Sequence, residues 1–139
     1  MNRLSELKER KKLDNNGFSL VELIIVIAIM AVLIGVLAPQ YLKYVEKSRQ
    51  SADLDSIDSM VNAVTIYSAD PANSIVSDNL KCTGGTVTAD AEVTAALTSA
   101  GITNLPEMKS KAYQDWNIKF SETGMVFTGT NGAALQAAM

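Results

Sequence analysis

The sequence predicts an α+β fold, in which one long N-terminal helix is followed by a small head with an antiparallel sheet. Three observations lead to this prediction. Apolar residues are concentrated in one run near the N-terminus, helical periodicity continues beyond that run, and short stretches of alternating polarity follow a cluster of helix breakers. With 139 residues, the chain has room for one ordinary domain.

The apolar run is FSLVELIIVIAIMAVLIGVLA, residues 18–38, and Glu22 is its only charged residue. Its length matches the roughly 20 residues that cross the hydrocarbon core of a bilayer. A helix in the core of a soluble domain would instead carry polar residues on one side. We therefore expect residues 18–39 to form a membrane-inserted half of the long helix.

Gly35 and Pro39 mark the place where we expect this helix to bend or to unwind locally. Pro39 could also end the helix, but residues 41–69 contain no further Gly or Pro. Apolar residues recur there at spacings of three and four, at Leu54, Ile57, Met60, Val61, Val64 and Tyr67. The helix is therefore predicted to resume and to end at about residue 69, with this stripe facing the head.

The head is predicted to comprise residues 40–139, including the second half of the helix. The helix ends at Asp70-Pro71-Ala72-Asn73-Ser74, and Cys82-Thr83-Gly84-Gly85 is predicted to turn. A short helix is expected at about residues 90–100 and a hairpin at about residues 115–129, while residues 133–139 could form a frayed helical turn or be disordered. About 70 residues bury only a marginal core, so the long helix must provide one wall.

The composition argues against an enzyme. The chain has no His and one Cys, which removes the commonest general base, the Cys–His nucleophile, the zinc cluster and any disulfide within the chain. We expect no cofactor and no metal: Asp53, Asp55 and Asp58 lack calcium-loop spacing, and a solvated helix face is the favoured interpretation. The net charge of -3 and the pI near 4.9 argue against a nucleic-acid-binding surface.

A short basic leader precedes the apolar run and ends in Asn16-Gly17-Phe18-Ser19-Leu20-Val21-Glu22. This junction resembles the class III signal of type IV prepilins and pseudopilins, in which Gly and Phe are followed, after three further residues, by Glu. The resemblance implies a pilin fold and a cut between Gly17 and Phe18 by a prepilin peptidase, which removes residues 1–17, followed by N-methylation of Phe18. Pro39 lies where the family has a helix-kinking proline. Cys82 is alone and cannot form the C-terminal disulfide of many pilins.

The resemblance also implies a function as the structural subunit of a type IV pilus. Such a subunit is held in the cytoplasmic membrane with its N-terminus inside. A pilus assembly platform and its ATPase then polymerise it into a helical surface filament that serves adhesion, motility or biofilm formation. A pseudopilin of a type II secretion or competence DNA-uptake system shares every motif used here. The alternative of another class is a monomeric, signal-anchored extracellular binding domain.

Glu22 needs an explanation of its own, because a charged carboxylate inside a bilayer costs on the order of 2.5–3.5 kcal/mol. It could snorkel to the headgroups, since it would lie four residues from the new N-terminus after cleavage. The interpretation we favour pairs it with the amine that the cut creates on Phe18 of a neighbouring subunit. Phe18 and Glu22 are therefore the predicted assembly residues.

Overall fold

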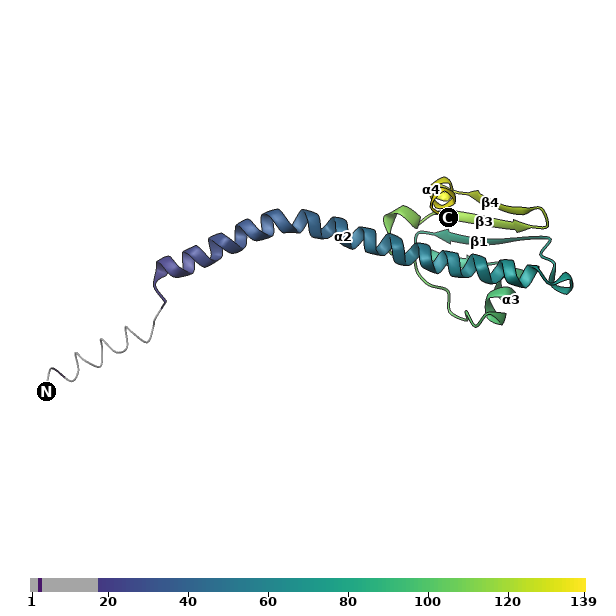
Figure 1. The fold of residues 1–139 in the computed structure, drawn as a ribbon, viewed down its shortest axis with the longest axis horizontal. Coiled ribbons are helices and arrows are strands. Elements are labelled where there is room, and N and C mark those ends of the chain that lie inside the picture. Colours follow the sequence, from purple (N-terminus) through teal and green to yellow (C-terminus); the bar gives the residue numbers. More distant parts are fainter. Residues whose placement is uncertain (1–2, 4–17) are drawn as a thin grey trace. The chain divides into compact units, whose positions relative to one another are not determined.

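A computed structural model describes Arg3 and residues 18–139 (Figure 1). Its α+β layout agrees with the prediction. The elements are helix α2 (Leu20–Ser68), strands β1 (Ser77–Thr83) and β2 (Thr86–Ala89), helix α3 (Ala91–Ser99), strands β3 (Trp116–Ser121) and β4 (Gly124–Thr128), and helix α4 (Gly132–Ala138). Two 3-10 turns, η1 (Pro71–Asn73) and η2 (Lys111–Tyr113), lie between them.

Helix α2 is continuous over 49 residues and passes through Pro39, so this proline does not end it. The chain divides into two compact units, which meet between Lys43 and Tyr44. In the first unit, every residue from 18 to 43 is exposed. The second unit is the head, and it contains the rest of α2 together with all the strands.

The head contains one antiparallel sheet with the strand order β2-β1-β3-β4. Leu80 on β1 lies opposite Ile118 on β3, and Cys82 lies opposite Trp116, so these four side chains share one face. The β3–β4 hairpin occupies the predicted segment. The β1–β2 hairpin was not predicted. The proposed turn at residues 82–85 is wrong for Cys82 and Thr83, which belong to β1, and the turn itself lies at Gly84 and Gly85, both with positive φ.

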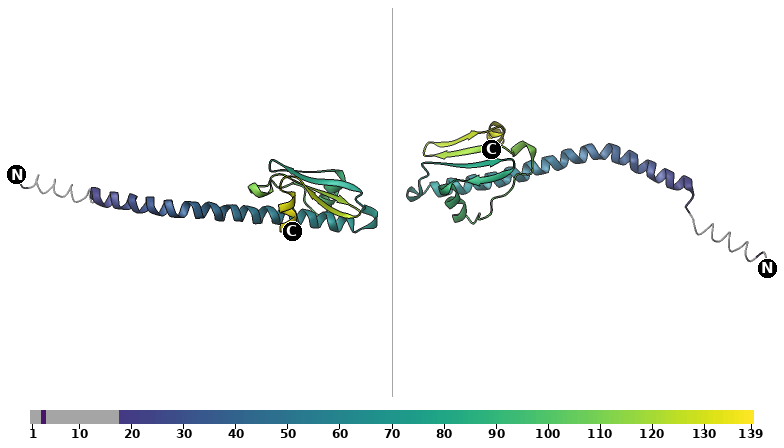
Figure 2. Two further views of the ribbon diagram at one scale, coloured as in Figure 1. Left: turned by 90° about the horizontal axis from the view of Figure 1, so that it is seen from above. Right: turned by 180° about the vertical axis from the view of Figure 1, so that it is seen from behind.

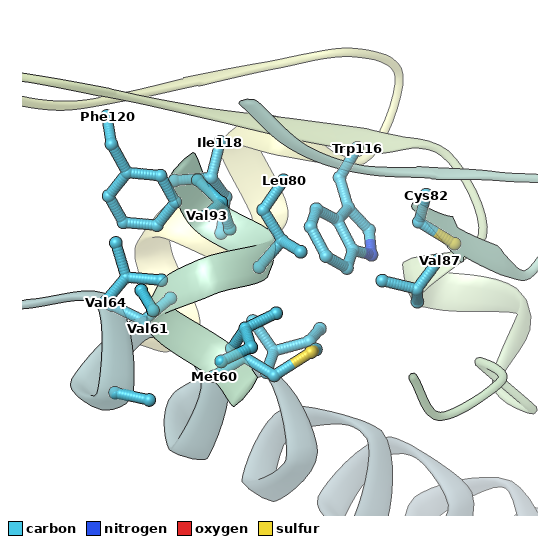
Figure 3. Close-up of a cluster of buried hydrophobic side chains, with 14 of the residues drawn as sticks. Met60, Val61, Val64, Leu80, Cys82, Val87, Val93, Trp116, Ile118 and Phe120 are labelled. Atoms are coloured by element: carbon cyan, nitrogen blue, oxygen red, sulfur yellow. The ribbon is translucent and has the colours of Figure 1, made fainter. Parts of the chain in front are cut away.

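The second half of α2 covers the apolar face of this sheet (Figure 2). Ile57, Met60, Val61 and Val64 of the predicted stripe are buried, and Leu54 and Tyr67 pack at the edge of the same cluster. Figure 3 shows three of these side chains facing the sheet. The sheet and α3 contribute Leu80, Cys82, Val87, Val93, Trp116, Ile118 and Phe120. The long helix therefore provides one wall of the core.

The two short helices are fixed to the sheet by different means. Asp78 at the start of β1 accepts hydrogen bonds from the backbone N–H groups of Glu92 (2.7 Å) and Val93 (3.3 Å), and so caps α3 from another element. Helix α4 buries Leu135 completely in the core. Of the two alternatives for residues 133–139, the structure shows a helix.

Candidate functional site

The predicted processing and assembly site lies at the start of α2. Gly17 and the rest of the leader lie outside the described residues. Phe18 is 86% exposed. The backbone N–H of Ser19 donates to Glu22 Oε2, and the backbone N–H of Glu22 donates to Ser19 Oγ, each at 3.3 Å.

This reciprocal pair is a capping box, the arrangement in which Ser and a Glu three residues later satisfy each other's free N–H groups at a helix start. It gives Glu22 a role within one chain that the charge-pair interpretation did not include. The signal was present in the sequence as Ser19-x-x-Glu22. Only one oxygen, Oε2, takes part in this pair in the described part of the chain, so Oε1 remains open to another donor.

The side chains of the apolar run that follows are exposed along its whole length. Its large apolar side chains are between 50% and 73% exposed from Leu20 to Leu37. Helix α2 is the one described helix that is long and apolar enough to cross a membrane. None of the residues in its most apolar 18-residue segment is buried. A helix that is apolar all round and that no other described residue covers needs lipid or other helices around it.

Gly35 and Pro39, the predicted bend residues, both lie inside α2. Apart from the neighbouring residues and the backbone of the surrounding helical turns, no atom of the described residues lies within 4 Å of the position that a Cβ on Gly35 would take, so packing within this part of the chain does not require a glycine there. A bend at these two residues stays a prediction.

A second polar site, absent from the sequence predictions, lies within the head. It joins residues 109–111 to the second half of α2. Asp53 is only 4% exposed, so the expectation that it lies on a solvated helix face is wrong. Its Oδ2 accepts hydrogen bonds from the backbone N–H groups of Lys109 (2.9 Å) and Ser110 (2.6 Å). Asp55 and Asp58 are exposed, as expected.

Glu46 makes the second contact of this site. Its Oε1 accepts from the Ser110 hydroxyl at 2.6 Å and from the Lys111 backbone N–H at 3.2 Å. The hydrogen bond from Ser110 is the main reason why the pKa of Glu46 is lowered from its ordinary value. Glu46 and Asp53 are seven residues apart on α2, and together they hold residues 109–111 against the helix. We call this pair of contacts the carboxylate clamp.

The clamp could have been partly foreseen. Asp53 lies four residues before Ile57 and seven before Met60, which places it on the buried face of α2. Its partners could not be foreseen, because they lie 56 and 57 residues further along the chain.

The described residues contain no group of three or more His, Cys, Asp or Glu side chains placed to hold a metal ion. Cys82 is 3% exposed, and burial raises the pKa of its thiol. A buried, protonated thiol is a poor nucleophile.

Residues 12–38 match the family model of the prokaryotic N-terminal methylation motif. The matched segment contains the predicted cleavage junction, the capping box and the apolar run up to Ala38. No curated protein and no solved structure matches the chain significantly.

Proposed function

Because residues 12–38 carry the class III signal peptide of type IV pilins and pseudopilins, we propose that the chain is the precursor of a type IV pilus subunit. The leader is removed between Gly17 and Phe18, and the new amine on Phe18 is methylated. The processed chain is held in the cytoplasmic membrane by the first half of α2 and then assembles through this helix into a filament outside the cell.

The observation that carries this proposal is the matched motif together with the uncovered helix. The 14 Leu, Ile, Val and Phe residues among residues 18–38 favour membrane insertion by about 4–8 kcal/mol in total. This exceeds the cost of about 2.5–3.5 kcal/mol for a charged Glu22 at the centre of the bilayer, and the real cost is smaller near the helix end. Insertion is therefore favourable even with the carboxylate charged.

Assembly replaces the lipid around the helix with neighbouring helices. Apolar contacts change little in this exchange, so packing shape and polar pairs decide whether it is favourable. The cut leaves the Ser19 N–H in place, so the capping box survives processing. Glu22 Oε1 is then available to the amine on Phe18 of another subunit, and repeated head-to-tail contacts of this kind generate an open filament.

The first test is the intact mass of the protein extracted from membranes. We expect a chain that begins at Phe18, with one added methyl group. A protein that retains residues 1–17 in cells with an active prepilin peptidase would overturn the proposal and support a signal-anchored domain.

The second test separates the two roles of Glu22. Glu22→Gln keeps the capping box, because Gln serves at this position as well as Glu, but it removes the charge. We expect normal insertion and cleavage of this variant and a loss of filaments comparable with that of Glu22→Ala. Ser19→Ala, the matched control, weakens the cap by about 1 kcal/mol and keeps the charge, so its filament yield should stay close to that of the wild type. Normal filament yield from Glu22→Gln would refute the charge pair.

The same motif supports a pseudopilin, and the proposal for a pilus can be tested against it. Electron microscopy of whole cells and of sheared surface fractions should show long fibres that contain this subunit. Deletion of its gene should then abolish the fibres. Loss of protein secretion or DNA uptake without any loss of long fibres would favour the pseudopilin instead.

A further inference from the structure

Basic residues are unevenly distributed in the part of the chain that follows the predicted cut. Residues 18–139 contain seven Lys and Arg residues. Five of them lie in two short segments, at Lys43, Lys47, Arg49, Lys109 and Lys111. The two others, Lys81 and Lys119, lie on the exposed face of the sheet. Acidic residues outnumber these two over the rest of the head: Asp55, Asp58, Asp70, Asp78, Asp90, Glu92, Glu107, Asp115 and Glu122.

The carboxylate clamp brings the two basic segments of the head together. The backbone of Lys111 is bonded to Glu46, which directly precedes Lys47 on α2. The backbone of Lys109 is bonded to Asp53, one turn beyond Arg49. Asp53 accepts from the backbone N–H groups of Lys109 and Ser110, and Glu46 accepts from the Ser110 hydroxyl and the Lys111 backbone N–H; none of these hydrogen bonds uses a lysine amine. Lys47, Arg49, Lys109 and Lys111 are all exposed, and we call these four residues the basic collar.

Removal of the leader would change how basic residues are distributed on the two sides of the membrane segment. Five basic residues of residues 1–17 flank the cytoplasmic side of the membrane segment under the proposed topology, in line with the positive-inside tendency. Cleavage after Gly17 removes all of them. The processed chain would then have its Lys and Arg residues only on the outer side, beginning five residues after Ala38.

We propose that the basic collar docks on the anionic phospholipid headgroups of the outer leaflet, and so holds the base of the head against the membrane before assembly. This inference rests on the proposed function, because it requires the first half of α2 to be inserted. Anionic headgroups attract the collar, and they repel the acidic remainder of the head. The two effects favour the same orientation of the head.

The spacing along α2 is compatible with this contact. The helical backbone from Ala38 to Lys47 measures about 14 Å at a rise of 1.5 Å per residue. The headgroup region extends about 5–7 Å beyond the hydrocarbon core, and the field of a charged surface reaches roughly 8 Å further at physiological ionic strength. Lys47 therefore lies within this field, and long basic side chains can extend further toward the headgroups.

The experiment compares lysine reactivity in two lipid environments. The full processed chain is reconstituted into vesicles of phosphatidylcholine alone, or of phosphatidylcholine with phosphatidylglycerol. Heads on the outside are reductively methylated with formaldehyde and dimethylamine–borane as the hydride donor, both uncharged, and the rate at each lysine is read by mass spectrometry. We expect Lys47 and Lys111 to react about three- to fivefold more slowly on anionic vesicles, and the difference to disappear at high salt. Lys109 should be slowed less, because Asp53 holds its backbone about 22 Å along α2 from Ala38. Lys81 and Lys119 are internal controls and should react equally in both.

A pair of matched variants tests whether the collar acts as one surface. Lys109→Gln with Lys111→Gln should restore most of the reactivity of Lys47 on anionic vesicles, because the remaining cations dock more weakly. Lys81→Gln with Lys119→Gln removes the same charge from the sheet face and should leave Lys47 protected. Two results would overturn the inference. One is equal methylation rates at the collar lysines in the two lipids, and the other is unchanged protection of Lys47 in the Lys109→Gln, Lys111→Gln variant.

Extraction with alkaline carbonate separates this failure from a failure of the proposed function. A chain that is released by carbonate is not inserted, which refutes the membrane anchor and the docking together. A chain that resists carbonate but shows equal lysine rates refutes only the docking.

Discussion

The carboxylate clamp leads to a quantitative prediction for Asp53→Ala. This substitution removes the acceptor for two backbone N–H groups, those of Lys109 and Ser110. Hydrogen bonds to a charged group contribute about 1.5–3 kcal/mol each, so the two together contribute about 3–6 kcal/mol. The N–H of Lys109, an exposed residue, can turn to water. Ser110 is fully buried, so its N–H stays unsatisfied. We expect the free energy of unfolding of the head to fall by about 3 kcal/mol.

Trp116 provides the assay. It is the only Trp in the chain, it is 2% exposed, and its indole N–H donates to the Tyr113 carbonyl at 3.0 Å. Its fluorescence therefore reports unfolding of the head in the full chain in mild detergent. A loss of about 3 kcal/mol corresponds to a fall in Tm of about 12–24 °C for a domain of this size.

Asp55→Ala is the matched control for this prediction. It removes the same group from the same helix, two residues away, at an exposed position, and should change the stability by less than about 0.5 kcal/mol. Asp53→Asn keeps one acceptor oxygen and should lie between the two. If Asp53→Ala and Asp55→Ala unfold at the same temperature, the clamp does not stabilise the head.

Four further substitutions can be tested with the same fluorescence assay. Gly129→Ala should cost about 2–4 kcal/mol, because φ is +92° and the added Cβ would lie 3.0 Å from the backbone of β3. Gly101→Ala, with φ +87° and open space, should cost only about 1–2 kcal/mol. Asp78→Ala should cost about 1 kcal/mol through loss of the α3 cap, and equal stability would refute that role. Because the Ser110 hydroxyl lowers the pKa of Glu46 from 4.5, this carboxylate stabilises the head above that pH and the contribution is lost on further acidification. Glu46→Gln should show a weaker dependence on pH below about 4.5 than the wild type.

The long helix and its apolar stripe could be predicted because both depend on local periodicity. The apolar residues from Leu54 to Tyr67 recur at spacings of three and four. All six residues of this predicted stripe belong to the core or pack against it. The β3–β4 hairpin was visible for the same reason, since Trp116, Ile118 and Phe120 alternate with polar residues. The candidate assembly residues Phe18 and Glu22 could be proposed from the motif alone.

The features that were missed depend on contacts between distant segments. Strand β1 has only two buried apolar residues, Leu80 and Cys82, and its first half contains Asp78 and Asn79, which are poor strand formers. It is nevertheless paired on both sides, and its pairing with β3 crosses some 40 residues of chain. Asp53 looked like one member of an acidic run because nothing near it in the sequence indicates that a loop will cover it.

The carboxylate clamp also affects how the head responds to force. Under the proposed function, a subunit in a fibre would be pulled along α2. The clamp connects the 109–111 loop to α2 at the N-terminal edge of the head, before the apolar contacts that begin at Leu54. This loop leads directly into the central strand β3. Tension on α2 would therefore act on the hydrogen bonds of the clamp as well as on the apolar core.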